Sequence, residues 1–252
     1  MVHKRSKNEI EMISKSCQIV ADTLNMLAEF VVPGCLISDL DKKAEDFINS
    51  KGARPAFKGY MGFPSTLCVS IEDAVVHGIP GDNILEEGQI VGIDCGAELN
   101  GYYGDHAKTF SVGEISNEKE KLMMITEQSL YKGIEKAVPG NYVGDISHAI
   151  QKHAESNGYS VVRELVGHGI GENLHEEPQV PNYGSPNQGY KLHSGMCIAI
   201  EPMINLGNRE IYTSKDGWTI LTVDGKVSAH FEHTIAIMED GPVILSEVKN
   251  NG

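Results

Sequence analysis

Two segments of the chain repeat each other's pattern, and this repeat constrains the fold more than any other feature of the sequence. VPGCLISDLDKKAEDFINSKG (32–52) and VPGNYVGDISHAIQKHAESNG (138–158) share Val, Pro, Gly, Asp, Ser and Gly in register at an offset of 106 residues. Each copy follows an apolar helical segment and indicates a helix end, a loop, a capping Asp or Ser, a second helix and a closing glycine. The repeat predicts two pseudo-symmetric helix-pair halves, about 1–113 and 114–252, although such punctuation also recurs by chance.

Between and after these helix pairs, short apolar stretches alternate with glycine-containing turns. This pattern is typical of antiparallel strands. The predicted strands are TLCVSI, IVGIDCGAEL, GYYGDHAKTFSV, MCIAIEPMI, WTILTV, VSAHFEHTIAI and PVIL. No linker or low-complexity segment separates the halves. We therefore predict an α+β protein with one domain, 1–252, whose halves share one sheet and one core.

Charge and cysteine content exclude several classes of protein. With 35 acidic and 21 basic residues the net charge is -14, so bulk electrostatics disfavour nucleic acid and anionic membranes. The five cysteines are scattered and never form CxxC, as expected for reduced thiols in a cytoplasmic protein. No apolar stretch approaches the roughly 18 residues of a membrane span. We expect a cytoplasmic monomer.

Two aspartates belong to a predicted β-hairpin. Asn100-Gly101 is a strong two-residue turn signal, and a turn centred there pairs Asp94 with Ala107 and Asp105 with Gly96. Asp94 and Asp105 then share one face of the hairpin, roughly 7 to 8 Å apart at the backbone. A pair of solvent-facing acids is the alternative, but Asp94 lies in the apolar run IVGIDCG, where an unpaired carboxylate is costly. The hairpin therefore favours metal ligands.

Three further residues complete a metal-competent set. His168 lies in the glycine-rich stretch GHGIG, and Glu201 and Glu232 lie in the apolar runs IAIEPM and FEHT. A buried ion pair could explain both glutamates, but no Lys or Arg lies within several residues of either, so a cation is the more economical partner. Four carboxylates and one imidazole suit a pair of hard or borderline divalent cations. HExxH and GxSxG are absent, and GHGIG lacks the context of a dinucleotide loop.

Nearly the whole chain resembles the type I methionine aminopeptidases. The resemblance rests on five motifs in order: GYMGFPSTLCVSIEDAVVHGIP, the Asp94–Asp105 hairpin with GDHAKTF, GHGIGENLHEEPQVPNY, HSGMCIAIEPMIN and DGWT with SAHFEHT. It implies the pita-bread fold, in which two pseudo-symmetric helix-pair halves surround a curved antiparallel sheet. It also implies that the enzyme removes the N-terminal methionine from nascent polypeptides when the next residue is small. The ribosome is a candidate place for this contact.

The resemblance also implies roles for individual residues. Two divalent ions (Co, Mn, Fe or Zn) would be held by Asp94, Asp105, His168, Glu201 and Glu232. Asp105 and Glu232 would bridge the ions, and a hydroxide between them would attack the scissile carbonyl. The catalytic side chains would be Glu201 as proton shuttle, His77 bonding the scissile peptide and His175 steadying the oxyanion.

A methionine pocket is implied beside this centre, lined by Tyr60, Phe63, Cys68 and Trp218; without the resemblance, ordinary core residues are an alternative interpretation of nearly equal weight. The chain departs from the usual family pattern at three positions nearby. Phe57 replaces a common Cys, Met61 a common His and Leu174 a common Phe. His106 and Ala107 also stand where Thr-Ser is commoner. These departures concern specificity and metal preference rather than the ligand set.

Two other functions fit part of the pattern. An Xaa-Pro aminopeptidase or prolidase of the same fold would share all five ligands, but usually carries an N-terminal domain, whereas here the first helix is expected within about ten residues. A non-catalytic relative that binds protein or RNA would be expected to have lost ligands.

Overall fold

The two copies of the repeat fold as matching helix pairs in the computed structural model, which describes residues 2–248. α1 (Lys7–Ala28) precedes α2 (Ile37–Ser50), and α3 (Asn117–Ile134) precedes α4 (Val143–Ser156). The offset of 106 residues relates α2 to α4 at both ends. The repeat glycines all have positive φ, a conformation that glycine adopts at little cost: Gly34 90°, Gly52 74°, Gly140 97° and Gly158 87°.

The second helix of each pair begins differently from the prediction. The residues at the N-caps of α2 and α4 are Leu36 and Tyr142, not Asp or Ser. Loop carbonyls instead accept from the first helical N–H groups: Ile37 N donates to Asn83 O at 3.0 Å, and Val143 N to Tyr190 O at 2.9 Å. Tertiary contacts thus satisfy these donors, and the repeat aspartate of α4 contributes from the third helical position, where Asp145 Oδ2 accepts from Tyr142 N at 2.7 Å.

The strands form four hydrogen-bonded sheets within residues 2–248, so the prediction of one shared sheet is wrong at the level of hydrogen bonding. Every pair is antiparallel, as predicted. The first sheet contains β1 (Arg54–Pro55), β2 (Leu67–Ile71), β4 (Ile90–Leu99) and β5 (Tyr102–Ser111). The second contains β3 (Ala74–Val76), β11 (Ile211–Thr213) and β12 (Ile220–Thr222).

The other two sheets carry the C-terminal strands. The third contains β6 (Ser160–Val161), β10 (Met203–Asn205) and β13 (Ser228–His230). The fourth has the order β15 (Gly241–Ile244), β14 (His233–Met238), β9 (Cys197–Ile200), β7 (Val166–Gly169) and β8 (Glu176–Pro181). A 3-10 turn, η1 (Tyr60–Gly62), lies between β1 and β2.

Two predicted long strands are each broken at a glutamate. MCIAIEPMI divides into β9 and β10 around Glu201-Pro202, and VSAHFEHTIAI divides into β13 and β14 around Phe231-Glu232. Pro202 has no N–H to give to a ladder. The pairing register nevertheless continues across the gap, because Met203 pairs with His230 and Ile200 with His233, so that residue numbers add up to 433 on both sides. Residues 201 and 232 satisfy the same sum and therefore face each other where the sheets separate.

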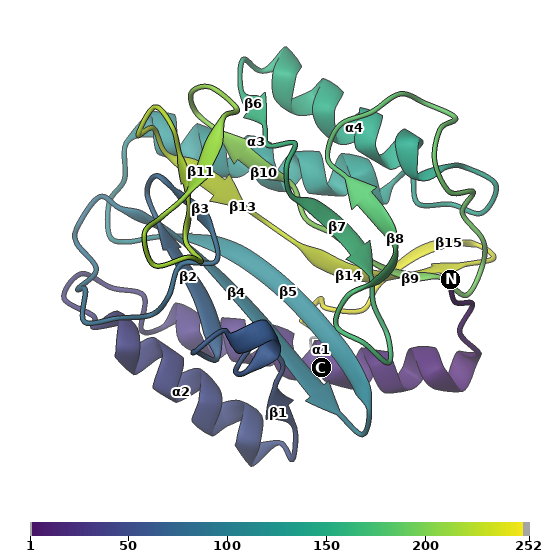
Figure 1. Ribbon diagram of the computed structural model, residues 1–252, viewed down its shortest axis with the longest axis horizontal. Helices are drawn as coiled ribbons and strands as arrows, with labels where there is room; N and C mark the ends of the chain where they lie inside the picture. Colours follow the sequence, from purple (N-terminus) through teal and green to yellow (C-terminus); the bar gives the residue numbers. More distant parts are fainter. Residues whose placement is uncertain (1, 249–252) are drawn as a thin grey trace.

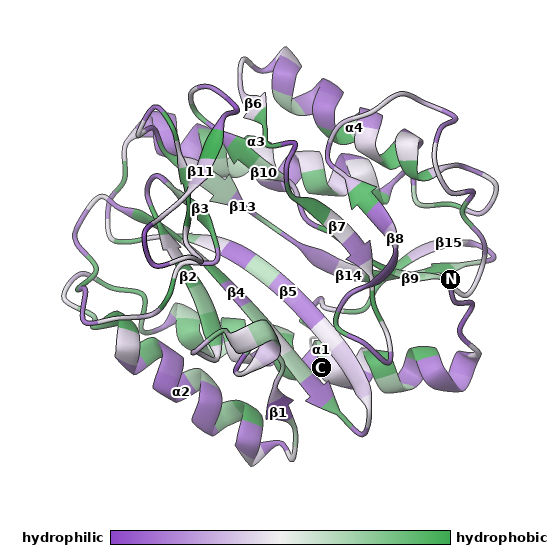
Figure 2. Cartoon of the chain, viewed as in Figure 1, coloured by the Kyte–Doolittle hydropathy of each residue, from purple (hydrophilic) through white to green (hydrophobic). Residues whose placement is uncertain are grey.

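The helices cover the strands from two sides. Figure 1 shows α1 and α2 along one side of the strands and α3 and α4 along the opposite side. In Figure 2 the hydrophobic colour follows β2 and β4, whereas the visible face of α2 is largely hydrophilic. The buried apolar residues form several clusters rather than the single predicted core. One gathers residues of the first half, such as Leu40 and Ile93, and another residues of the second, such as Ile146 and Ile198.

A third cluster joins the two halves. It contains Ile13 and Phe63 together with Ile170 and Cys197. The proposed boundary near residue 113 and the treatment of 1–252 as one domain stay predictions. No helix within residues 2–248 combines the length and the hydropathy required to cross a bilayer.

Candidate metal centre

The β4–β5 hairpin places Asp94 and Asp105 as its turn signal predicts. Asp94 pairs with Ala107 and Gly96 with Asp105, which confirms the register. Asn100 and Gly101 have φ of 55° and 85°, the two positive values required by a type I′ turn. The two aspartates therefore lie diagonally on one face of the hairpin.

A network between β5 and the start of β14 fixes Glu232 beside Asp105. Glu232 N donates to Ala107 O at 2.9 Å, and the Thr234 hydroxyl donates to Asp105 O at 2.8 Å. His106 contacts the Glu232 carbonyl through Nδ1 and stacks on His233 with ring centroids 4.5 Å apart. These contacts hold Asp105 and Glu232, which are far apart in the sequence, next to each other.

His168, at the end of β7, presents one ring nitrogen to the acids. Its Nδ1 lies 2.9 Å from Gly169 O, which makes Nδ1 the protonated nitrogen and leaves Nε2 as a free donor of an electron pair. Nε2 lies 3.9 Å from Asp105 Oδ2 and 3.5 Å from Glu201 Oε1. Burial lowers the pKa of His168 to about 3, so the ring is neutral at pH 7.

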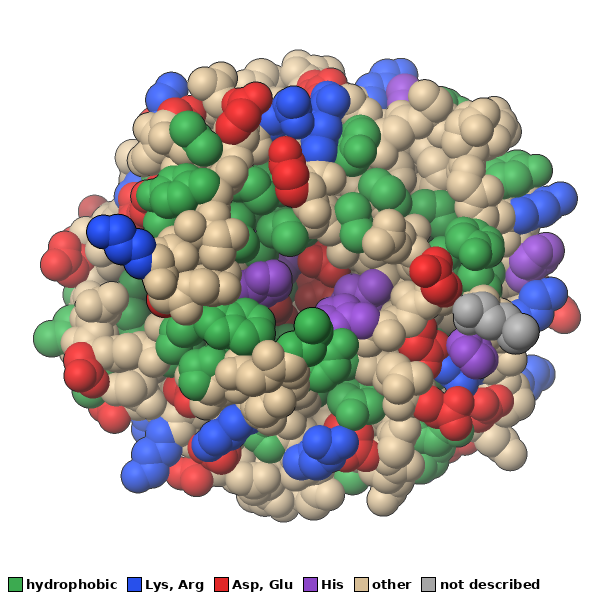
Figure 3. Space-filling view, in the orientation of Figure 1, with side chains coloured by type: hydrophobic (Ala, Val, Ile, Leu, Met, Phe, Trp, Pro, Cys, Tyr) green, Lys and Arg blue, Asp and Glu red, His purple; other side chains and the backbone are tan. Residues whose placement is uncertain are grey.

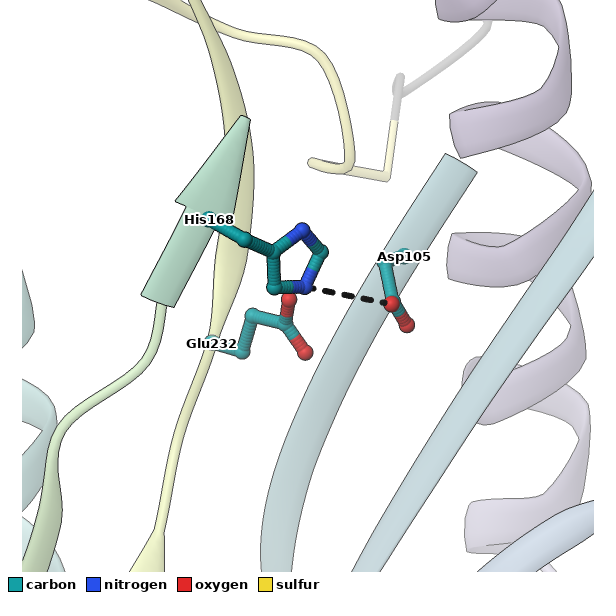
Figure 4. Close-up of side chains that lie close together, drawn as sticks. All are labelled: Asp105, His168 and Glu232. Atoms are coloured by element: carbon teal, nitrogen blue, oxygen red, sulfur yellow. Dashed lines mark ion pairs between the residues drawn. The ribbon is translucent and has the colours of Figure 1, made fainter. Parts of the chain in front are cut away.

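Three donor atoms converge closely enough to share a cation. One from each of Asp105, His168 and Glu232 lies within 4.8 Å of the others. Figure 4 shows the three side chains turned toward one another from β5, β7 and the segment before β14. The structure thus brings together one part of the predicted ligand set as a candidate metal site.

Burial raises the proton affinity of all four acids. Burial raises the pKa of Asp94 to about 7, although hydrogen bonds to Asp105 and the Cys95 amide oppose the shift. Burial and neighbouring carboxylates hold the pKa values of Asp105, Glu201 and Glu232 well above the ordinary range. Such crowding is costly when the groups are ionised.

The chemistry of these donors fits divalent cations. Asp94 Oδ1 and Glu232 Oε1 are buried without a hydrogen-bond partner. Among residues 2–248, neither Lys nor Arg forms an ion pair with any of the four acids. The alternative of a buried ion pair for Glu201 and Glu232 therefore finds no support in the described part of the chain. A cation would satisfy the orphaned oxygens and offset the repulsion.

The raised pKa of Asp94 leads to a prediction for the metal-free protein. Asp94→Asn should gain stability relative to the parent as pH rises from about 4 to about 7. In this window the folded parent retains a proton that the unfolded chain releases, so its free energy of unfolding falls as pH rises. The asparagine side chain does not titrate, so the free energy of unfolding of the variant does not fall for this reason. Urea unfolding with chelator present measures the difference at both ends of the window, and a difference independent of pH contradicts the prediction.

All the predicted site residues line one cavity of about 190 Å³. Figure 3 shows the hollow near the centre of the molecular face, with acidic side chains at its floor, histidines beside them and hydrophobic side chains at its rim. The predicted residues along its wall are Tyr60, Phe63, Cys68, His77, Asp94, Asp105, His168, His175, Glu201, Trp218 and Glu232. The three departures, Phe57, Met61 and Leu174, complete the lining.

The wall of the cavity divides into an apolar part and a polar part. Phe63 and Trp218 meet edge to face, with ring centroids 5.2 Å apart at 78°. The Tyr60 hydroxyl lies 2.8 Å from Nδ1 of His175. Burial lowers the pKa of His77, so this ring too is neutral at pH 7. Met61, 82% exposed, stands at the rim.

His230 is a residue that the sequence reasoning missed. Its buried Nε2 has no hydrogen-bond partner and lies 3.8 Å from Glu201 Oε2. The signal was present in AHFEHT, because residues two apart in an extended segment share a face. His230 is therefore expected on the same face as Glu232.

A larger groove of about 530 Å³ runs along α3 and α4, but no predicted site residue lines it.

Comparison with known proteins agrees with this geometry. Residues 11–239 match metallopeptidase family M24. Methionine aminopeptidase of Clostridium perfringens is 52% identical over 249 residues, which cover 99% of this chain and 100% of that protein. The chain belongs to the methionine aminopeptidases of metallopeptidase family M24. The crystal structure of methionine aminopeptidase from Thermotoga maritima superposes with a TM-score of 0.97 at 43% identity, covering 98% of this chain and 100% of that one. These likenesses confirm the predicted pita-bread fold.

Prolidases are more distant relatives. The prolidase of Pyrococcus furiosus has a TM-score of 0.79 and 25% identity, and the match covers 98% of this chain and 66% of that one. The difference in identity favours the methionine aminopeptidase over the Xaa-Pro alternative. As a member of a metallopeptidase family the chain uses divalent metal, and the cluster of Asp105, His168 and Glu232 is the candidate site for it.

Proposed function

We propose that this methionine aminopeptidase removes the N-terminal methionine from nascent polypeptides whose second residue is small, and that the 190 Å³ cavity is its active site. One observation carries the proposal: the acid and histidine cluster and the apolar aromatic wall line the same cavity. A cluster alone would suit many hydrolases, whereas an adjoining apolar pocket suits a thioether side chain.

Two divalent ions would be held by the predicted ligand set, which includes Asp105 and Glu232. The remaining ligands would be Asp94, His168 and Glu201. Bound there, the ions would supply Lewis acidity and lower the pKa of water toward neutrality. Co, Mn, Fe and Zn all suit this mixture of carboxylates and imidazole.

The chain's own side chains would then act on the substrate. Glu201, whose Oε1 lies 3.5 Å from His168 Nε2, would hold and pass on a proton. His77 would hydrogen-bond the scissile peptide. With the Tyr60 hydroxyl donating to Nδ1, His175 would keep Nε2–H to donate to the developing oxyanion.

The methionine side chain would lie against Tyr60, Phe63, Cys68 and Trp218. Burial holds the pKa of Cys68 well above its ordinary value, so its thiol is a neutral, polarizable surface. Phe57 and Leu174 line the same cavity and would shape the space around the first two substrate residues.

Trp218→Ala is expected to raise KM for Met-Ala-Ser about tenfold, since an apolar contact of this size contributes about 1–3 kcal/mol to binding. The edge-to-face contact with Phe63 is lost while the cluster is untouched. Tyr190→Ala is the matched control, because Tyr190 is an aromatic residue 50% exposed outside the cavity lining. Steady-state kinetics measure both; an unchanged KM in Trp218→Ala would place the methionine pocket elsewhere.

A peptide panel tests the proposed function directly. Protein reconstituted with Mn or Co should release methionine from Met-Ala-Ser and leave Gly-Pro and Ala-Pro substrates intact. Chelator should abolish release, and added metal should restore it. Cleavage of the Xaa-Pro substrates with Met-Ala-Ser left intact would defeat the proposal in favour of a prolidase-like activity.

The same proposal covers the partners, the cellular compartment and the oligomeric state of the enzyme. Its partners would be nascent polypeptide N-termini, reached in the cytoplasm as a monomer. The five cysteines are free, as suits a reducing compartment, and the net charge of -14 gives no bulk attraction to nucleic acid. Size-exclusion chromatography with light scattering checks the oligomeric state.

A further inference from the structure

Arg5 is a buried arginine that the proposed chemistry leaves without a role. Its side chain is only 3% exposed, although it precedes α1 at the start of the described chain. Its backbone is anchored too, since Arg5 N donates to Gly195 O at 2.7 Å. In Figure 1 the start of the chain lies beside β9 and β15. A buried guanidinium is costly unless carboxylates pair with it.

The carboxylates that pair with Arg5 belong to the loop after β7 and to the first residue of β8. Nη2 donates to both oxygens of Glu176, at 2.7 and 2.6 Å, and Nη1 donates to Glu172 at 2.9 Å. Glu9 lies farther away, at 3.7 Å. The Glu176 side chain is 6% exposed and that of Glu172 57%. Arg5–Glu176 is therefore the interaction in which both charges are removed from water.

The backbone of this segment closes around the guanidinium. A Cβ on Gly171 would come 2.4 Å from Arg5 Nη2, so this position has no room for a side chain. Asn173 N donates to Glu176 Oε1 at 3.0 Å, which means that one carboxylate holds both the arginine and the turn. Gly171 O accepts from Tyr103 N at 2.8 Å, which ties the segment to β5.

His175 directly precedes Glu176, and its side chain lines the cavity. Its ring centroid lies 4.3 Å from that of His168, and its Nδ1 meets the Tyr60 hydroxyl. His175 is exposed at the rim, where its ring contacts only the rings of Tyr60 and His168 among the aromatic side chains of residues 2–248. The neighbouring Glu176 carboxylate, 6% exposed and paired with Arg5, anchors the backbone directly after His175.

We propose that Arg5 is a positioning residue that holds His175 at the rim of the cavity by clamping Glu176 and the 171–175 segment. The inference rests on the proposed function for the role of His175, but the clamp itself is a property of the fold. Loss of the guanidinium leaves the Glu176 carboxylate buried without a countercharge. The 171–175 segment, which positions His175, then becomes less well ordered. A displacement of about 1 Å is enough to cost about a hundredfold in rate.

Kinetics of the full-length, metal-loaded protein test the clamp. Arg5→Met should lower kcat for Met-Ala-Ser about ten- to a hundredfold with little change in KM, because the lost contact acts on the transition state. Arg5→Lys keeps the charge and one donor and should recover part of the loss. Arg54→Met is the matched control: Arg54 pairs with Glu98, and its side chain is 62% exposed. Unchanged kcat in Arg5→Met overturns the proposal.

A double-mutant cycle separates positioning from general destabilisation. In a His175→Ala background, Arg5→Met should change kcat by less than about twofold, since the group it positions is already gone. An equal loss in both backgrounds overturns the proposal. If Arg5→Met does not fold, the milder Arg5→Lys and Glu172→Gln carry the same comparison, with an intact unfolding transition as the criterion of folding.

Hydrogen exchange provides a readout independent of activity. In metal-free protein, the amides of 171–175 should exchange faster in Arg5→Met than in the parent, while those of β4 do not change. Unchanged exchange in this segment overturns the clamp. If the parent fails to turn over Met-Ala-Ser, the proposed function falls, and the exchange experiment still decides the fate of the clamp.

Discussion

Glu201→Gln is expected to lower kcat for Met-Ala-Ser by about 10²- to 10⁴-fold, the range attributed to a positioned general acid or base. The amide has the same shape as the carboxylate but cannot accept and return a proton. Glu201 lies where the register of two broken strands places it opposite Glu232, 3.5 Å from His168. Because Glu201 is also a proposed ligand, the measurement requires saturating metal and a metal content determined for each variant.

Glu210→Gln is the control for this substitution, since the Glu210 side chain is 56% exposed and lies outside the cavity lining. It should leave kcat unchanged. If Glu201→Gln with full metal content retains turnover within about tenfold of the parent, the proton shuttle is another group. If neither the parent nor the variant acts on any peptide, the non-catalytic alternative gains and the enzyme hypothesis falls.

Asp105→Asn is expected to change stability in opposite directions with and without metal. In the metal-free protein at pH 8, it removes one of four crowded acids and should raise the free energy of unfolding. With metal at 100 to 1,000 times its Kd, the parent should gain about 3–4 kcal/mol, and the variant should lose most of this gain. Its kcat/KM should fall by at least about a hundredfold.

Thermal unfolding and metal titration calorimetry measure these effects together. Asp82→Asn, at an exposed loop aspartate, should match the parent in both. A metal-free Asp105→Asn protein less stable than the parent would mean that the acids do not destabilise one another. A variant that binds metal as tightly as the parent would remove Asp105 from the ligand set.

The hairpin was predictable to the residue because its information is local. Asn100-Gly101 specifies the turn, and the twofold alternation of a strand then places Asp94 and Asp105 on one face. The helix pairs were predictable for a similar reason, since each copy of the repeat contains its own Pro-Gly loop and its own closing glycine. The expected caps were wrong because loop carbonyls from outside the repeat bond the first N–H groups of α2 and α4.

The long strands through Glu201 and Glu232 were predicted as continuous because both glutamates have apolar neighbours on each side. Periodicity reports which residues are buried, but it does not report which sheet buries them. The break places the two acids where the sheets separate, and this depends on pairing between segments about 30 residues apart. His230 lies 3.8 Å from Glu201 there; it was missed although its two-residue spacing from Glu232 is a local signal for a shared face.

The sequence by itself determined the helix pairs, the hairpin register, the candidate ligand types and the family, because each of these is encoded within one segment or in the order of several motifs. Only the tertiary structure decided how the segments meet. It brings Glu232 to Asp105 through His106 and Thr234, orients His168 through Gly169, and anchors the His175 segment on Arg5. These contacts join residues far apart in the chain, and the energy of burying a charge or a polar group, which selects them, exists only after the chain has folded.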